Sequence, residues 1–326
     1  MIQSSFKFLD LHKILPEGWQ EEYSCYEIFD SIPSDKETEV ICTNCNKAKG
    51  KFLKQNQFAY RGERFFQYQC TSCNVWFSPE YDQSKIRNDD YSETFEVMDN
   101  RRTELRFSML EGLQLQKGIR LLEIGCGLGG LLNRIKVSFP DLKVVGLDDS
   151  QKMVDCMLGQ GLEAHQNSST ISGKFDRVIA HHVIEHFKHP EDFHKVLQEF
   201  CDPGAIIQIT FPNRENWFIK RGLFPDLHLP MHRFYFSLDE LNDFFEFKGY
   251  KILECSSNES QRFIPNLTQA IYNHLRADLS LFKRRYTELC QWIESIPAEQ
   301  VELIEKELTE KNLGSEGCLL ITFPKD

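Results

Sequence analysis

Short apolar runs alternate with amphipathic stretches from Gly118 onward. The runs are rich in Ile, Leu and Val, and the segments between them carry apolar residues at helical spacing. This alternation is typical of βαβ units, which build a parallel sheet covered by helices on both faces. The pattern predicts strands at 119–124, 143–148, 161–166, 175–181 and 205–211, and helices at 129–138, 150–158 and 191–201.

The pattern continues to the end of the chain. Ser237 and Glu240 have the spacing of a capping box, which predicts a helix through Phe245 that Gly249 terminates. A strand at 250–255 should follow. Two amphipathic helices, 265–294 and 298–313, then precede a last strand at 317–323. Whether these two helices cover a site or form a homodimer contact stays open.

The first 117 residues follow a different pattern. Residues 1–40 match no long regular element and form a lead-in, 41–78 contain two CxxC pairs among aromatic residues, and 79–117 form a linker that turns helical. Residues 118–326 form the α/β domain, with 265–313 as a helical insertion. A chain of 326 residues has room for one large core and a small accessory module.

Composition and charge narrow the functional classes. A net charge of −11 repels phosphate backbones and argues against a nucleic-acid partner. No apolar run approaches the length of a membrane span, and the N-terminus lacks the features of a signal peptide. We therefore expect no membrane partner, a cytoplasmic location and reduced cysteines.

A glycine-rich loop stands between the strand at 119–124 and the following helix. Gly125, Gly127 and Gly129 permit positive φ angles and a close approach of a ligand to the backbone. Asp148 ends the next strand, 19 residues after Gly129. An acid there can accept hydrogen bonds from ribose hydroxyls, so the order of elements predicts nucleoside binding at the carboxyl ends of the strands.

The loop alone leaves two cofactor classes open. Gly125, Gly127 and Gly130 also satisfy GxGxxG, which is found in enzymes that bind NAD or FAD. Glu123, directly before the loop, distinguishes the two. A carboxylate there suits a cofactor with a cationic amino-acid tail better than one with an anionic pyrophosphate.

Two stretches resemble a known family. EIGCGLG, 123–129, resembles the first motif of class I methyltransferases that use S-adenosylmethionine, and FDRVIAHHVIEH, 175–186, resembles the signature of the small-molecule branch related to ubiquinone O-methyltransferases. The resemblance covers about 118–255. It implies a Rossmann-like, seven-stranded sheet with a final antiparallel strand, which the run at 317–323 would supply.

The resemblance also implies a set of cofactor-binding residues. His181 closes the fourth strand, where the family contacts the cofactor, and Arg106 lies where related enzymes offer an arginine to its carboxylate. Asn167 is the nearest candidate for an adenine contact, because the usual acid after the third strand is missing. The predicted cofactor-binding residues are Arg106, Glu123, Gly125, Gly127, Gly129, Asp148 and His181.

Histidines are the candidate catalytic bases. Methyl transfer to an oxygen or a carbon requires removal of a proton near neutral pH, which imidazole can do. His182 and His186 follow the fourth strand, and His232 lies in the long aromatic segment 211–236, which is a substrate lid by position. The alternative is that His186 and the aromatic residues of the lid serve packing alone.

Four cysteines predict a metal site. Cys42, Cys45, Cys70 and Cys73 form two CxxC pairs, whose spacing suits two knuckles around one tetrahedral Zn²⁺. Four thiolates leave no coordination position for water, so the zinc should be structural and the module a small zinc ribbon.

Together these features predict an enzyme that transfers a methyl group from S-adenosylmethionine to a small-molecule acceptor such as a sugar, a glycan precursor or another metabolite. An RNA methyltransferase guided by the ribbon and a non-catalytic scaffold or regulator that binds S-adenosylmethionine are the alternatives.

Overall fold

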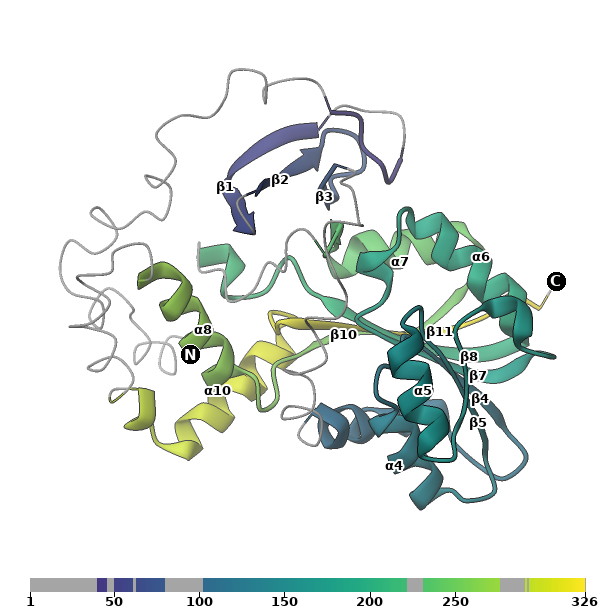
Figure 1. Ribbon diagram of the computed structural model, residues 1–326. Coiled ribbons are helices and arrows are strands. Elements are labelled where there is room, and N and C mark those ends of the chain that lie inside the picture. The colour runs from purple at the N-terminus through teal and green to yellow at the C-terminus, as the bar shows by residue number, and fades with distance from the viewer. Residues whose placement is uncertain are drawn as a thin grey trace. The chain divides into compact units, whose positions relative to one another are not determined.

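The computed structural model describes residues 40–45, 50–60, 63–79, 102–221, 231–275, 291 and 293–325 (Figure 1). The predicted lead-in, 1–40, lies almost wholly outside the described residues, as do 80–101 of the predicted linker. The chain forms two compact units. The sheet unit comprises Glu80–Pro212, Leu238–Cys255 and Cys318–Asp326, and the ribbon unit comprises Met1–Pro79, Asn213–Ser237 and Ser256–Gly317. The domain boundaries at 40, 78 and 117 stay predictions.

A seven-stranded sheet among the described residues has the order β10-β11-β8-β7-β4-β5-β6 and belongs to the sheet unit, except for the end of β10 and the start of β11. Its strands are β4 (Arg120–Ile124), β5 (Lys143–Leu147), β6 (Glu163–His165), β7 (Phe175–His181), β8 (Cys201–Pro212), β10 (Lys251–Asn258) and β11 (Glu316–Thr322). The pairs β4–β5, β4–β7, β5–β6 and β7–β8 are parallel. The α/β fold class and the predicted strands are therefore confirmed, with β8 longer than expected.

The last strand runs against its neighbour. The Gly204 N–H donates to the Phe323 carbonyl over 3.2 Å, and the Phe323 N–H donates to Ala205 over 2.9 Å. At the other end of the pair, Asn213 N–H donates to Ser315. Along these hydrogen bonds the residue numbers rise on the β8 side while they fall on the β11 side, so the two strands are antiparallel. This confirms the predicted final antiparallel strand.

Helices cover both faces of this sheet (Figure 1). On one face, apolar residues of the helices pack with Leu121, Val144 and Ile179 of the sheet in a single buried cluster. On the other face, the ring of Phe193 lies 6.5 Å from that of Phe245. The helices are α4 (Gly130–Ser138) and α5 (Gln151–Gly159) on the first face, and α6 (Pro190–Phe200) and α7 (Leu238–Phe247) on the second.

Helix boundaries follow local chemistry. Helix α6 begins at Pro190, whose fixed φ suits the first helical position, with Glu191 and Asp192 in the first turn. Helix α7 begins after Ser237, and Gly249 with φ +84° follows its end, as the sequence predicts. Among the described residues, no helix combines the length and apolarity that crossing a lipid bilayer requires.

The ribbon unit contains a four-stranded sheet among its described residues, in the order β1-β2-β3-β9. Its strands are β1 (Gly50–Tyr60), β2 (Glu63–Cys70), β3 (Trp76–Phe77) and β9 (Phe234–Tyr235), all paired antiparallel. Its other elements are η8 (Ile219–Arg221), α8 (Phe263–Leu275) and α10 (Ala298–Glu310). The strand β9 comes from the segment that follows β8, so this sheet joins residues far apart in the chain.

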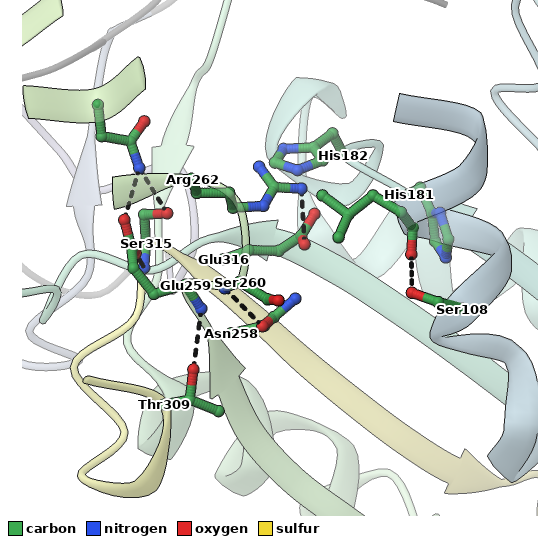
Figure 2. Close-up of polar contacts among 12 residues, drawn as sticks. Ser108, His181, His182, Asn258, Glu259, Ser260, Arg262, Thr309, Ser315 and Glu316 are labelled. Carbon is green, nitrogen blue, oxygen red and sulfur yellow. Dashed lines mark hydrogen bonds and ion pairs between the residues drawn. The ribbon is translucent and has the colours of Figure 1, made fainter. Parts of the chain in front are cut away.

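Hydrogen bonds of Glu259 connect α8 and α10 of the ribbon unit to the start of β11 (Figure 2). Its carboxylate accepts hydrogen bonds from the Asn266 amide at 2.9 Å and from the Ser315 N–H, while its own N–H donates to Thr309 Oγ1 at 3.1 Å. Glu259 is fully buried. Burial raises its pKa to about 7, although the hydrogen bonds from Asn266 and Ser315 oppose the shift.

Candidate functional site

The glycine loop leaves β4 and enters α4. Gly125, Gly127 and Gly129 have φ angles of +68°, +53° and +78°, a region that other residues adopt only at a cost. The Gly125 N–H donates to the carbonyl of Leu147 at the end of β5, over 2.7 Å. The loop is thereby fixed at the carboxyl ends of two parallel strands, where ligands bind in this type of sheet.

The glycines serve different purposes. A Cβ at Gly125 would lie 2.5 Å from Val183 Cγ2, and a Cβ at Gly129 would lie 2.7 Å from Met157 Cγ. A Cβ at Gly127 would have no heavy atom within 4 Å. Gly125 and Gly129 therefore allow close packing, whereas Gly127 leaves open space beside the loop backbone.

Asp148 faces this loop from the end of β5. Its Oδ2 accepts the Gly127 N–H at 2.8 Å, and its Oδ1 accepts the Ser150 N–H at 3.0 Å. The side chain is partly exposed. Burial raises the pKa of Asp148, and the two backbone hydrogen bonds oppose this shift. Since each carboxylate oxygen can accept a second hydrogen bond, the group is held in place and can still bind hydroxyls.

Glu123 is almost completely buried, with 1% of its surface exposed, near the end of β4. The carboxylate of Glu123 acts electrostatically on the thiol of Cys126 in the loop. The pKa of Cys126 is raised mainly by burial, and also by the charges of Glu123 and Asp148. Two carboxylates thus give this end of the sheet a negative field, which favours a cationic ligand over an anionic one.

His181 ends β7 and is buried. Its Nε2 lies 3.2 Å from Gln208 Oε1, and the Gln208 amide donates to the Met109 carbonyl at 2.6 Å. This chain of contacts orients the imidazole against β8. A backbone carbonyl therefore fixes the amide, and the amide fixes the ring.

His182 follows with a left-handed backbone, φ +56°. Its N–H donates to the Thr210 carbonyl over 2.9 Å, and its Nδ1 lies 3.2 Å from Oε1 of Glu185, which is fully buried. His186 is exposed at the end of the short helix η7 (Ile184–His186). The prediction of site residues did not include Glu185, although it stands in the same VIEH motif.

Two further residues of the sheet unit are predicted to contact the cofactor. Arg106 is partly buried in the helical stretch 102–108. Asn167 is exposed two residues after β6, and its carbonyl accepts hydrogen bonds from Thr170. Their roles toward the cofactor stay predictions.

His232 belongs to the ribbon unit, whereas His182 and His186 belong to the sheet unit. It is buried, and its ring centre lies 5.6 Å from that of Tyr235 on β9. Trp217 and Phe218, in the same predicted lid, pack on Phe263 of α8 with ring centres 6.0 Å and 5.6 Å away. Within the ribbon unit these two lid aromatics therefore have a packing role.

The four ribbon cysteines converge on one point. Their sulfur atoms all lie within 4.8 Å of one another, with Cys42 and Cys73 at 3.7 Å and Cys45 and Cys70 at 3.6 Å. A tetrahedral zinc with Zn–S bonds of about 2.3 Å requires sulfur separations of about 3.8 Å. The set therefore fits a zinc ion.

The surroundings of these sulfur atoms favour a thiolate at Cys73, whereas burial raises the pKa of Cys70. The N–H groups of Ser72 and Cys73 both donate to Cys70 Sγ over 3.3 Å. The pKa of Cys73 falls to about 5, because Cys42 and Asn44 donate to its sulfur against the effect of burial, while the pKa of Cys42 is raised. Thiolate sulfur is the form that binds a metal.

Comparison with known proteins agrees with this geometry. Residues 96–255 match the model of a family described as a methyltransferase domain. The cyclopropane-fatty-acyl-phospholipid synthase of Escherichia coli (strain K12) is 30% identical over 138 residues, 38% of this chain and 35% of that protein. The ubiquinone biosynthesis O-methyltransferase of Caulobacter sp. (strain K31) is 31% identical over 109 residues, 30% of this chain and 42% of that protein. The chain thus spans less than half the length of these two relatives.

Solved structures with a similar arrangement include the plantazolicin methyltransferase BpumL in complex with SAH. The TM-score is 0.44 and the identity 18%, over 74% of this chain and 93% of that one. The strand order and the glycine loop define a Rossmann-like domain of the class I methyltransferase type. Over residues 96–255 the chain carries the match to the methyltransferase domain family, and a ubiquinone biosynthesis O-methyltransferase is among the relatives that it resembles.

Proposed function

We propose that this protein transfers a methyl group from S-adenosylmethionine to a small-molecule acceptor such as a sugar, a glycan precursor or another metabolite. The observation that carries the proposal is the loop at Gly127, with its open space, its link to Asp148 and the buried carboxylate of Glu123. A cofactor with a cationic sulfonium and ammonium group suits this negative environment, and an anionic pyrophosphate does not.

The loop residues would hold the cofactor. The ribose hydroxyls would donate to Asp148, whose carboxylate Gly127 and Ser150 already orient. His181, held by Gln208, would lie along the nucleoside, and Arg106 would pair with the cofactor carboxylate. Bound S-adenosylmethionine supplies an electrophilic methyl group.

His182 is the base that the local geometry of the sheet unit favours. The acceptor would release a proton when it is methylated, and the His182 imidazole would take up that proton. Glu185, 3.2 Å from Nδ1, orients the ring and stabilises the imidazolium that results. His186 and His232 remain the alternative bases.

The four cysteines would bind one structural Zn²⁺ in this proposal. All four ligand positions would be thiolates, so the metal would stabilise the ribbon and take no part in the chemistry. The cytoplasmic location and the absence of nucleic-acid and membrane partners stay predictions from the sequence.

The direct test combines binding and product analysis. Isothermal titration with S-adenosylmethionine, and with NAD⁺ as the competing ligand, should show binding of the first and not of the second. Incubation with methyl-labelled S-adenosylmethionine and fractionated extract should then move label into a small molecule. Binding of NAD⁺ with no binding of S-adenosylmethionine would refute the proposal, and label in RNA would favour the RNA methyltransferase.

A further inference from the structure

The sheet that carries the cysteine site is completed by a strand from the segment after β8. Strand β3 pairs with β9, with Trp76 opposite Tyr235 and Phe77 opposite Phe234. The pairing continues beyond the strands, because the Ser78 N–H donates to the Arg233 carbonyl over 2.8 Å. The metal module and the predicted lid therefore share one hydrogen-bonded sheet.

Two of the four cysteines control where β3 lies. Cys70 is the last residue of β2, its N–H donates to the Val75 carbonyl over 3.0 Å, and Cys73 lies between them in the turn. The turn that leads into β3 is thus the second cysteine knuckle. A strand of two residues is too short to hold its own position, so β3 depends on that knuckle and on its neighbours.

Strand β9 is linked to the residues that directly follow β8 as well as to β3. Phe236 bridges to Asn213, and its carbonyl accepts the Arg214 N–H over 2.9 Å. The Arg214 guanidinium lies 5.3 Å from the centre of the Trp76 ring, which ties this same segment back to β3. His232, two residues before β9, has its ring beside Tyr235. Its position is therefore coupled to the pairing of β3 with β9.

We propose that metal binding by the four cysteines positions β9 and His232 through β3, so that the ribbon sets the conformation of the C-terminal part of the predicted lid, 211–236. The expected effect on catalysis rests on the proposed methyl transfer. The expected effect on the position of β9 rests on the strand pairing alone. The segment starts at Asn213, directly after β8 ends at Pro212. In open α/β sheets, ligands bind beyond the carboxyl ends of the parallel strands, which is where this segment begins. Trp76 and Phe77 act as positioning residues.

Hydrogen exchange on the full chain tests the structural part. The protein is compared with one equivalent of Zn²⁺ and after removal of the metal with a chelator. Amides at 74–78 and 232–236 should exchange at least about tenfold faster without zinc, while those of β4 and β7 should change less than about twofold. Trp76 lies on β3 and Trp217 in the predicted lid, so tryptophan fluorescence provides an independent signal.

A variant with an intact metal site separates pairing from metal binding. Ser78→Pro removes the N–H that donates to Arg233 and touches no cysteine, so it should keep one equivalent of zinc and still show the faster exchange at 232–236. Lys51→Ala, at an exposed position on β1 at the other edge of the sheet, is the matched control and should behave as the wild type.

Kinetics test the catalytic part. Zinc removal and Ser78→Pro should each lower kcat/KM for the acceptor by at least about tenfold, and leave the Kd for S-adenosylmethionine within about twofold. Exchange at 232–236 that is unaffected by metal loss would overturn the inference, as would a chain that binds less than about a fifth of an equivalent of zinc. If S-adenosylmethionine does not bind at all, the proposed function fails while the exchange result still decides the coupling.

Discussion

Three glycine-to-alanine changes separate the cost of a backbone conformation from the loss of a ligand site. Gly125, Gly127 and Gly118 all have positive φ, so alanine at each costs about 1–2 kcal/mol in backbone strain. Gly125→Ala also drives its Cβ to 2.5 Å from Val183, and such overpacking adds about 1–3 kcal/mol. The Cβ atoms of Gly127→Ala and Gly118→Ala would meet nothing within 4 Å.

The expected stabilities follow from these terms. Gly125→Ala should lower the unfolding free energy of the sheet unit by about 2–5 kcal/mol, and the other two changes by about 1–2 kcal/mol each. Hydrogen exchange of the β4 and β7 amides is the assay, because it reports directly on the strands beside the loop.

Cofactor binding should rank the same changes differently. Gly127→Ala fills the open space beside the N–H that Asp148 holds, and should raise the Kd for S-adenosylmethionine at least about tenfold, equivalent to about 1.4 kcal/mol. Gly118→Ala, before β4 and outside the loop, should leave the Kd unchanged. The reasoning is refuted if Gly127→Ala binds the cofactor as the wild type does, or if Gly125→Ala is no less stable than Gly118→Ala.

Four further predictions follow. Asp148→Asn should raise the Kd for S-adenosylmethionine by about 10- to 100-fold in titration calorimetry, because hydrogen bonds to a charged group contribute about 1.5–3 kcal/mol, and an unchanged Kd would exclude a ribose contact. His182→Asn keeps a residue that tolerates φ +56°, so cofactor binding should persist while kcat falls about 10²- to 10⁴-fold; a retained kcat would transfer the role of base to His186 or His232. The pKa of Glu259 is raised to about 7 from 4.5, so the folded state keeps a proton that the unfolded state loses. The free energy of unfolding should therefore fall by about 2–3 kcal/mol as the pH rises from 5 to 8. Urea denaturation should show this pH dependence in the wild type and not in Glu259→Gln. Cys45→Ser should reduce the zinc content measured by atomic emission, and zinc content equal to the wild type would argue against the four-cysteine set.

Local rules account for what the sequence predicts well. Each strand of the sheet carries its own apolar run, and α4, α5 and α6 begin within one residue of their predicted starts. One βα unit and the next strand bring the loop at Gly125–Gly129 close to Asp148, so the order of elements alone predicts that they are neighbours. The two cysteine pairs can also be found from the sequence, because the two cysteines of each pair lie within four residues of one another. Only the approach of one pair to the other requires the sheet.

The tertiary structure decided the contacts between distant segments. Glu185 lies beside His182 because the left-handed backbone at His182 turns the chain into η7, a conformation that no periodicity indicates for a histidine. Gln208 reaches His181 only because β7 and β8 pair in register. The pairing of Trp76 with Tyr235, and the burial of Glu259 between α8, α10 and β11, depend on side-chain packing and hydrogen bonding between remote residues. The pattern of apolar positions specifies which face of each element is buried, but not which partner covers it.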